Sequence, residues 1–316
     1  MEGRHGTRKI ISPGDPFRDW VVSLFDGQVR DPACCLTVSQ IRPASHMVCR
    51  CTSDGGDLDV VVKFFAEPTG KIREYDPERA MKREYRMLKK AQKAGVPVAQ
   101  PLAVNRTFKC ALVTAYVPGT PLGVHITDCS SLYSRLSAVA GVMRLLHARR
   151  SSSYEKAREF STFHDVLDQV ELSQRKRGRF NDLLGAWWHS GDLDRRRGCM
   201  IHRDATPANY LFQGEQVTAI DFESAWTRAH PVHDLGVFCA EMKSLFREQY
   251  GDPSAAEPYI GHLLREYAGS SAEFEGVVAA LPFFMALGYL RTARLDLGEK
   301  DQRWLIKEAE RCLRRP

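Results

Sequence analysis

One segment of the chain constrains its fold and its chemistry more than any other. In the stretch 201–209, Asp204 and Asn209 stand five positions apart in a polar loop between two short apolar strands. Twelve residues after Asn209, Asp221 lies near the end of another apolar run, 217–222. Mg²⁺ favours a few protein oxygens together with phosphate and water. The pattern therefore predicts a cleft in which Asn209 and Asp221 hold a cation, with Asp204 beside them.

The N-terminal part of the chain is rich in strand signals. A helix is predicted from Pro77 to Ala94, with Asp76 as its N-cap and Gly95 after its end. β-Branched and aromatic residues cluster between turn residues and predict strands over 34–41, 47–52, 58–65, 96–104 and 110–117. Together these elements indicate a five-stranded antiparallel sheet with one helix.

The remainder of the chain is predominantly helical. Two prolines flank a glycine in 118–121, which is typical of a connector and sets the predicted lobes at 1–117 and 118–316. Apolar residues from Leu132 to Leu146 recur at steps of three and four, as in an amphipathic helix. Further helices are predicted over 163–174, 180–189, 235–250, 258–268, 274–295 and 303–313.

Composition narrows the class of protein. A chain of 316 residues exceeds what one compact core usually supports, so two lobes are expected. The net charge of +6 does not require a nucleic-acid partner, and the apolar run 277–290 falls short of the roughly 20 residues of a membrane span. Nine cysteines without a CxxC pair argue against a zinc ribbon. Their odd number and the polar N-terminus predict a cytoplasmic protein with free thiols.

The motif around Asp204 has a close parallel in known proteins. The sequence His202-Arg203-Asp204 with Asn209, followed by Asp221-Phe222-Glu223, resembles the protein-kinase-like superfamily, and in particular its aminoglycoside phosphotransferase and choline kinase branch. Small-molecule kinases of this branch also lack the glycine of the protein-kinase DFG triplet, where this chain has Glu223. Arg203, in contrast, is more typical of protein kinases.

Other segments follow in the order that the resemblance requires. Lys63 matches the phosphate-binding lysine, and Glu84 matches its ion-pair partner on the following helix. The stretch 115–119 resembles the hinge that binds adenine through backbone groups. The stretch 230–235 resembles the segment in which an aspartate, here Asp234, braces the catalytic loop. The similarity extends over about residues 36–246.

The resemblance implies a bilobal α+β fold, with a nucleotide-binding lobe at 1–117 and a catalytic and substrate-binding lobe at 118–316. It implies an ATP- and Mg²⁺-dependent phosphotransferase that acts on a hydroxyl of a small molecule, such as an aminoglycoside, a sugar or an amino alcohol. Asp204 is the expected catalytic base. The expected cofactor-binding residues are Lys63, Glu84, Ser45, Ala115 and Val117, and the expected metal ligands are Asn209, Asp221 and Glu223.

Two features leave alternatives open. No GxGxxG motif stands between the first two strands, and Ser45 in the stretch 42–46 is expected to offer phosphate donors there instead. Only eleven positions separate Glu223 from Asp234, which is too short for a peptide-binding activation segment. A protein Ser/Thr kinase and a nucleotide-binding pseudokinase remain the competing readings. The basic runs 175–179 and 195–197 are either solvated or face an anionic substrate, RNA or lipid.

Overall fold

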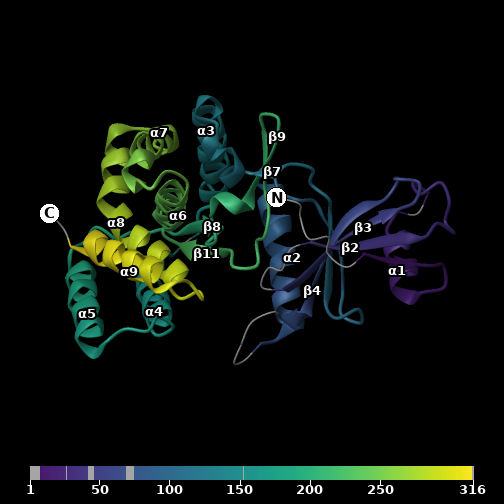
Figure 1. Cartoon of the computed structure of the whole chain (residues 1–316), viewed down its shortest axis with the longest axis horizontal. Coiled ribbons are helices and arrows are strands. Elements are labelled where there is room, and N and C mark those ends of the chain that lie inside the picture. Colours follow the sequence, from purple (N-terminus) through teal and green to yellow (C-terminus); the bar gives the residue numbers. More distant parts are fainter. Residues whose placement is uncertain (1–7, 26, 42–45, 69–74, 152, 315–316) are drawn as a thin grey trace. The chain divides into compact units, whose positions relative to one another are not determined.

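The computed structural model describes residues 8–25, 27–41, 46–68, 75–151 and 153–314. By their internal contacts, the residues form two compact units (Figure 1). Unit 1 comprises 1–93 and 98–118, and unit 2 comprises 94–97 and 119–316. The first is built on an antiparallel sheet and the second is mostly helical, which confirms the predicted α+β class.

Unit 1 is organised around a six-stranded antiparallel sheet. In sheet order its strands are β1 (Arg8–Ile11), β2 (Leu36–Ile41), β3 (His46–Ser53), β4 (Asp59–Pro68), β6 (Ala111–Ala115) and β5 (Pro101–Asn105). The expectation of five strands was wrong because β1 was missed. β1 pairs with β2 from Arg8↔Ser39 to Ile11↔Leu36. Three of its four residues are exposed, so this edge strand carries no alternation of buried and exposed residues.

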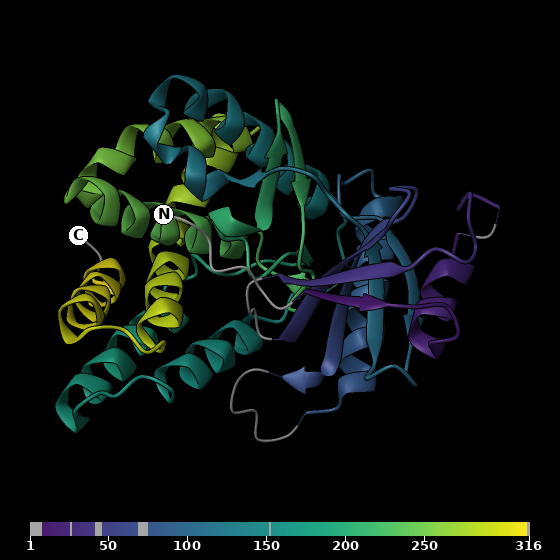
Figure 2. The same ribbon diagram turned by 45° about the vertical axis from the view of Figure 1, so that its right-hand side comes forward.

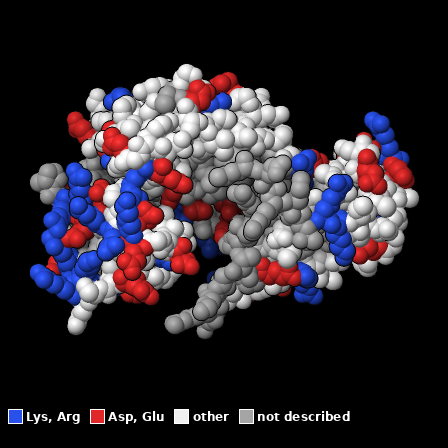
Figure 3. Space-filling view, viewed as in Figure 1, with Lys and Arg blue, Asp and Glu red and all other residues white. Residues whose placement is uncertain are grey.

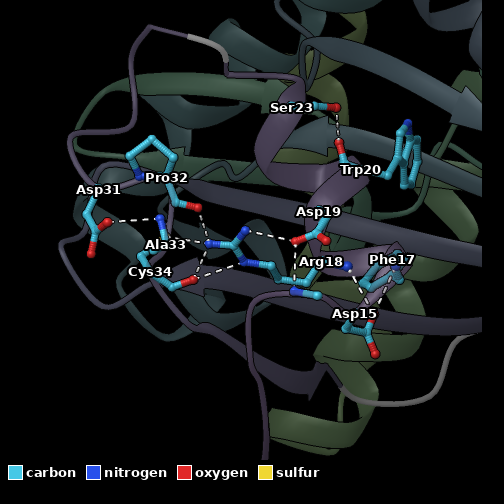
Figure 4. Close-up of polar contacts among 11 residues, drawn as sticks. Asp15, Phe17, Arg18, Asp19, Trp20, Ser23, Asp31, Pro32, Ala33 and Cys34 are labelled. Carbon is cyan, nitrogen blue, oxygen red and sulfur yellow. Dashed lines mark hydrogen bonds and ion pairs between the residues drawn. The ribbon is translucent and has the colours of Figure 1, made fainter.

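A short helix, α1 (Pro16–Ser23), which the sequence patterns did not indicate, packs on this sheet. Asp15 caps it by accepting the amides of Phe17 and Arg18 at 2.9 and 3.2 Å (Figure 4). Arg18 is only 4% exposed. Its guanidinium donates to the carbonyl of Cys34 at 2.9 Å and to that of Pro32 at 2.5 Å, and it pairs with Asp19. This one side chain thus ties α1 to the loop that leads into β2.

The two faces of the sheet are covered by different helices. Val60 and Val62 on β4 belong to the apolar cluster that also contains residues of α1. Because side chains alternate along a strand, Lys63 projects from the opposite face. There it meets Glu84 of α2 (Pro77–Lys93). Gly95 follows α2 in the left-handed region, with φ of +77°, as predicted for the end of that helix.

Unit 2 contains short strands followed by a helical core. Strands β10 (Gln216–Ala219), β9 (Tyr210–Gln213) and β7 (Thr120–Pro121) form one sheet, and β11 (Trp226–Ala229) pairs with β8 (Cys199–Ile201). The helices are α3 (Cys129–His147), α4 (Lys156–Leu167), α5 (Gln174–His189), α6 (Val232–Tyr250), α7 (Glu257–Tyr267), α8 (Ser271–Ala293) and α9 (Glu299–Leu313), with 3₁₀ turns at Leu122–Thr127, Pro207–Asn209 and Pro253–Ala256.

The predicted helix over 163–174 was misplaced. The chain forms α4 up to Leu167 and starts α5 at Gln174, where the Ser173 hydroxyl caps the new helix by accepting the Lys176 amide. The apolar stripe of α3, in contrast, is buried as predicted: Leu132, Leu136, Val139, Met143 and Leu146 are at most 2% exposed.

The core of unit 2 is the packing of α8 against α6 and α9 (Figure 2). Gly236 on α6 allows close approach, because a Cβ there would stand 2.3 Å from the Cβ of Phe284. Among the described residues, α8 is the one helix whose length and composition would allow it to cross a membrane. In that helix, 67% of the most apolar window is buried, as in a core helix. Trp187 is likewise buried, whereas Trp188 is 41% exposed.

Candidate active site

The loop that follows β8, His202–Asn209, brings the predicted aspartate and asparagine into direct contact. The Asn209 side-chain nitrogen donates to the Asp204 backbone carbonyl at 2.8 Å and to the Asp204 carboxylate at 3.1 Å. A 3₁₀ turn at Pro207–Asn209 folds the chain back on itself, and the Asn209 amide closes it on the Thr206 carbonyl. Asp204 keeps 31% of its side chain exposed, so a substrate can reach it.

Asp234 holds the start of this loop from beneath. It is fully buried, and its carboxylate accepts the amides of His202 and Arg203, each at 2.7 Å. His147 adds a third contact at 3.1 Å from its Nε2. Burial raises the pKa of Asp234, but the His147 hydrogen bond and the neighbouring histidines outweigh burial, so its pKa is lowered overall. Asp234 therefore stays charged and braces the loop, as the resemblance implies.

His202 links the same loop to the segment of the second predicted carboxylate. Its Nε2 donates to the Ile220 carbonyl at 2.8 Å, and its ring packs on Phe222 with centroids 4.6 Å apart. The Ile220 amide in turn donates to the Asn209 carbonyl at 3.0 Å. Asp221 therefore follows a backbone position that is fixed against the His202–Asn209 loop. Its φ of +63° is rare for a residue with a side chain and is typical of a constrained functional turn.

These residues supply a donor set that fits Mg²⁺. Carboxylate oxygens of Asp221 and Glu223 lie within 4.8 Å of each other, and both side chains are half-buried. Because the Asn209 nitrogen faces Asp204, its amide oxygen points elsewhere and accepts no hydrogen bond within the described part of the chain. Two carboxylates and one amide oxygen are hard ligands of the kind that Mg²⁺ prefers.

Sequence reasoning missed one residue of this site. Arg291 on α8 donates to the backbone carbonyl of Arg203 and forms an ion pair with the Asp204 carboxylate. Its neighbour Thr292 donates to Glu241 on α6. Burial raises the pKa of Glu241, although that hydrogen bond and Arg291 oppose the rise. No motif marks Arg291, which lies 87 positions from Asp204 in the chain.

In unit 1, Lys63 and Glu84 form the predicted ion pair. The Lys63 ammonium lies 3.0 Å from a Glu84 carboxylate oxygen, and the two residues are only 8% and 3% exposed. Such a buried pair has a fixed geometry, because moving either charge away from the other would leave it unsatisfied. The pairing of Lys63 with Glu84 that the resemblance implies is therefore present.

The predicted hinge lies at the end of β6 in the same unit. The Ala115 amide donates to the Gln100 carbonyl and the Tyr116 amide donates to the Asp59 carbonyl, at 2.9 and 3.2 Å. Arg50 stacks on the Tyr116 ring at 3.6 Å and so stiffens this strand end. The Val117 amide has no acceptor among the residues described for this unit. Ser45 lies outside the described residues.

Comparison with known proteins decides the family. The sequence model of the phosphotransferase enzyme family (APH) matches residues 37–272. The chain belongs to the phosphotransferase enzyme family. It is thus a phosphotransferase of the protein-kinase-like, small-molecule kinase branch, as the motifs around Asp204 predicted. No curated protein matches the sequence of this phosphotransferase.

Solved structures share the fold of this phosphotransferase at low identity. A choline/ethanolamine kinase family protein from Mesorhizobium loti has a TM-score of 0.63 and 17% identity, over 96% of this chain and 95% of its own. Amicoumacin kinase, solved in complex with AMP-PNP, Ca²⁺ and Ami, has a TM-score of 0.62 and 17% identity, over 87% of both chains. A putative aminoglycoside phosphotransferase from Ralstonia eutropha has a TM-score of 0.60 and 17% identity, over 93% of this chain and 96% of its own. The predicted kinase-like fold is confirmed.

Proposed function

We propose that this phosphotransferase moves the terminal phosphoryl group of ATP, with Mg²⁺, to a hydroxyl of a small molecule. The observation that carries the proposal is the restrained but accessible carboxylate of Asp204. Asn209 and Arg291 each hold one side of it, while 31% of the side chain stays exposed. A carboxylate held in this way can accept a hydrogen bond from one attacking hydroxyl in one direction.

In the proposed reaction the substrate oxygen forms a bond to the γ-phosphorus of ATP, and the bond from that phosphorus to the β–γ bridging oxygen breaks. ADP leaves with the bonding electron pair, and Asp204 receives the hydroxyl proton. Asn209, Asp221 and Glu223 would hold Mg²⁺, which when bound neutralises charge on the phosphates. The protein itself contributes mainly positioning, since the transfer needs little covalent chemistry.

We propose that unit 1 binds the nucleotide and that residues 118–316 supply catalysis and the acceptor site. Lys63, directed by Glu84, would contact the phosphates. Ala115 and Val117 would bind adenine through their backbone, with the Val117 amide as the available donor. AMP-PNP in the amicoumacin kinase structure supports nucleotide use by the fold.

The charges near Asp204 bear on the acceptor. Arg291 contacts Asp204 directly. Arg294 is a second guanidinium nearby: burial lowers its pKa, and the charge of Arg291 lowers it further. Among the acidic residues of this half of the chain, Glu241 lies near enough to Asp204 for the Asp204 charge to contribute to its raised pKa. Glu257 is instead paired with Lys243. Guanidinium groups beside the proposed catalytic carboxylate favour a neutral or anionic hydroxyl compound over a polycation.

The test is ADP formation from MgATP with a panel of sugars, sugar acids, amino alcohols and aminoglycosides. With the acceptor that responds, Asp204→Asn should lower kcat by roughly 10²–10⁴-fold while nucleotide affinity persists. Asp182→Asn, an exposed change on α5, is the control. Retained turnover in Asp204→Asn would refute the role of Asp204.

Arg291 provides a second measurement at the same site. Arg291→Ala should lower kcat by about tenfold or more with a smaller change in the KM for ATP, because the Asp204 carboxylate loses one of its two donors. Arg291→Lys should restore part of the rate. An unchanged kcat in Arg291→Ala would show that the ion pair does not orient Asp204.

The competing functions are less well supported. The stretch between Glu223 and Asp234 is occupied by β11, which pairs with β8, and by the start of α6. It therefore offers no peptide platform, and a protein kinase is disfavoured. A pseudokinase would bind ATP without forming ADP in the panel above.

We also propose a cytoplasmic location: the cysteines with described side chains are free, and burial raises the pKa of Cys51 and Cys312 to about 12.

We infer that the basic run 175–179 is a solvated surface. It lies in α5, where Arg177 pairs with Asp168 and Arg179 pairs with Glu310. Figure 3 shows Lys and Arg side chains gathered over α5 and α9, with Asp and Glu interspersed among them. Such mixed charge supports a solvated face rather than a nucleic-acid surface.

A further inference from the structure

Unit 2 contains a cavity of about 490 Å³ that none of Asp204, Asn209, Asp221 and Glu223 lines. Its walls come from the end of α3, the loop between α5 and β8, the turn before α6, the end of α7 and the first turns of α8. The volume falls in the range of small-molecule sites, about 300–1,000 Å³.

The rim of this cavity is strongly basic. Four arginines line it: Arg144, Arg150, Arg195 and Arg197. Arg150, Arg195 and Arg197 make no ion pair and no side-chain hydrogen bond with any residue that the structure describes, and all three are exposed. Guanidinium groups that share one cavity are a usual means of binding phosphate or carboxylate.

Carboxylates at the cavity only partly offset these charges. Three line it, Asp192, Asp194 and Glu273. Lys156 pairs with Asp194 at 2.6 Å, and Glu273 accepts the Gly269 amide at 2.8 Å. With Lys156 included, positive charges outnumber negative charges around the cavity, so its field favours an anion.

The floor is formed by buried polar side chains, among them His147, His230 and Tyr267, which are 6%, 2% and 4% exposed. Burial lowers the pKa of His230 well below its usual range, and the charge of Arg195 lowers it further. His230 is therefore neutral and its Nδ1 accepts the Val232 amide at 3.2 Å. His230 therefore adds no positive charge, whereas the arginines stay charged at any pH in the physiological range.

We propose that this cavity binds a phosphorylated small molecule and that its occupancy is transmitted to the His202–Asn209 loop. Phosphate is the favoured group because four guanidinium groups can share its oxygens in bidentate pairs. The binding site does not require the function proposed above, so the two can fail separately.

A short chain of contacts connects the floor to the loop. The Tyr267 hydroxyl lies 2.9 Å from Nδ1 of His147, and Nε2 of His147 lies 3.1 Å from Asp234. Because Nε2 donates to the Asp234 carboxylate, the other ring nitrogen, Nδ1, is the one that faces the Tyr267 hydroxyl. Asp234 then holds the two amides that precede Asp204. A ligand that orders Tyr267 and His147 therefore restrains the start of the loop.

Binding is tested by calorimetry of the whole chain with glucose 6-phosphate and with inorganic phosphate, without nucleotide or metal. The variant Arg195→Gln/Arg197→Gln should lose at least about tenfold in affinity for glucose 6-phosphate, since it removes charge-assisted hydrogen bonds. The matched control, Arg175→Gln/Arg196→Gln, removes the same charge at two exposed positions outside the cavity. Equal affinity in both double variants, or no binding of either probe to the unaltered chain, would overturn the proposal.

Transmission is tested by hydrogen exchange of peptides that cover 200–206. Saturating glucose 6-phosphate should slow their exchange in the unaltered chain. In Tyr267→Phe, which keeps the ring but removes the hydroxyl, the ligand should still bind while the slowing is reduced. Saturation without any change of exchange in the unaltered chain would refute the coupling and leave the anion site standing.

Discussion

Replacing Asp234 by asparagine tests how the His202–Asn209 loop is held. In the native structure both carboxylate oxygens are used: one accepts the His202 amide and the His147 ring, and the other accepts the Arg203 amide. Asparagine offers only one acceptor oxygen, and its NH₂ group would face one of the donors. The change keeps the size of the side chain, so the effect is one of hydrogen bonding and charge.

The expected loss of stability follows from these contacts. One amide hydrogen bond of 2.7 Å to a charged acceptor disappears, which removes about 1.5–3 kcal/mol. The Arg203 amide that is left without its acceptor is partly buried, which adds about 1–3 kcal/mol. Together these losses lower the free energy of unfolding of unit 2 by about 2.5–6 kcal/mol.

Urea unfolding followed by tryptophan fluorescence measures this loss, because four of the five tryptophans lie in unit 2. The midpoint should fall by about 1 M or more for Asp234→Asn. Amide exchange at His202 and Arg203 should also quicken. The control Asp182→Asn, at an exposed position, should change neither. If the midpoint and the exchange rates of Asp234→Asn match those of that control, Asp234 does not brace the loop.

Three further predictions concern stability. Arg18→Leu leaves the carbonyls of Pro32 and Cys34 without their donor and should destabilise unit 1 by about 2–4 kcal/mol in chemical unfolding followed by Trp20 fluorescence. The control Arg30→Leu, at a side chain that is 88% exposed, should change stability by less than about 1 kcal/mol. Gly236→Ala forces a Cβ to 2.3 Å from Phe284 and should lower the thermal midpoint of unfolding. The control Gly185→Ala, where α5 leaves open space for a Cβ, should raise that midpoint slightly. A rise in both variants would contradict the close packing of α6 on α8. The pKa of Asp234 is lowered in the folded state, so its contribution to stability is complete above its unfolded pKa of about 4 and is lost as pH falls through the folded pKa. Acid should therefore destabilise the native chain more steeply than Asp234→Asn. Parallel pH profiles of unfolding for the two proteins would count against this.

Local sequence patterns were sufficient for the parts of the molecule that depend on local spacing. In α3 the apolar residues recur at helical spacing, which can be recognised without knowing what the helix packs against. The apolar stripe from Leu132 to Leu146 is buried. Asp204 and Asn209 are five positions apart, so one tight loop is enough to join them. Lys63 and Glu84 were matched through the family resemblance, from a strand and the helix that follows it, and their charged groups meet at 3.0 Å.

Other features depend on residues that only folding brings together. Arg291 reaches Asp204 from α8 across 87 positions, and the cavity arginines come from two separate segments of unit 2. β1 is a strand because β2 offers it an edge, although its own residues show no buried face. A single sequence records local periodicity and short-range spacing. It does not record which distant side chains will share one space, because helix packing such as that of α6 on α8 decides this.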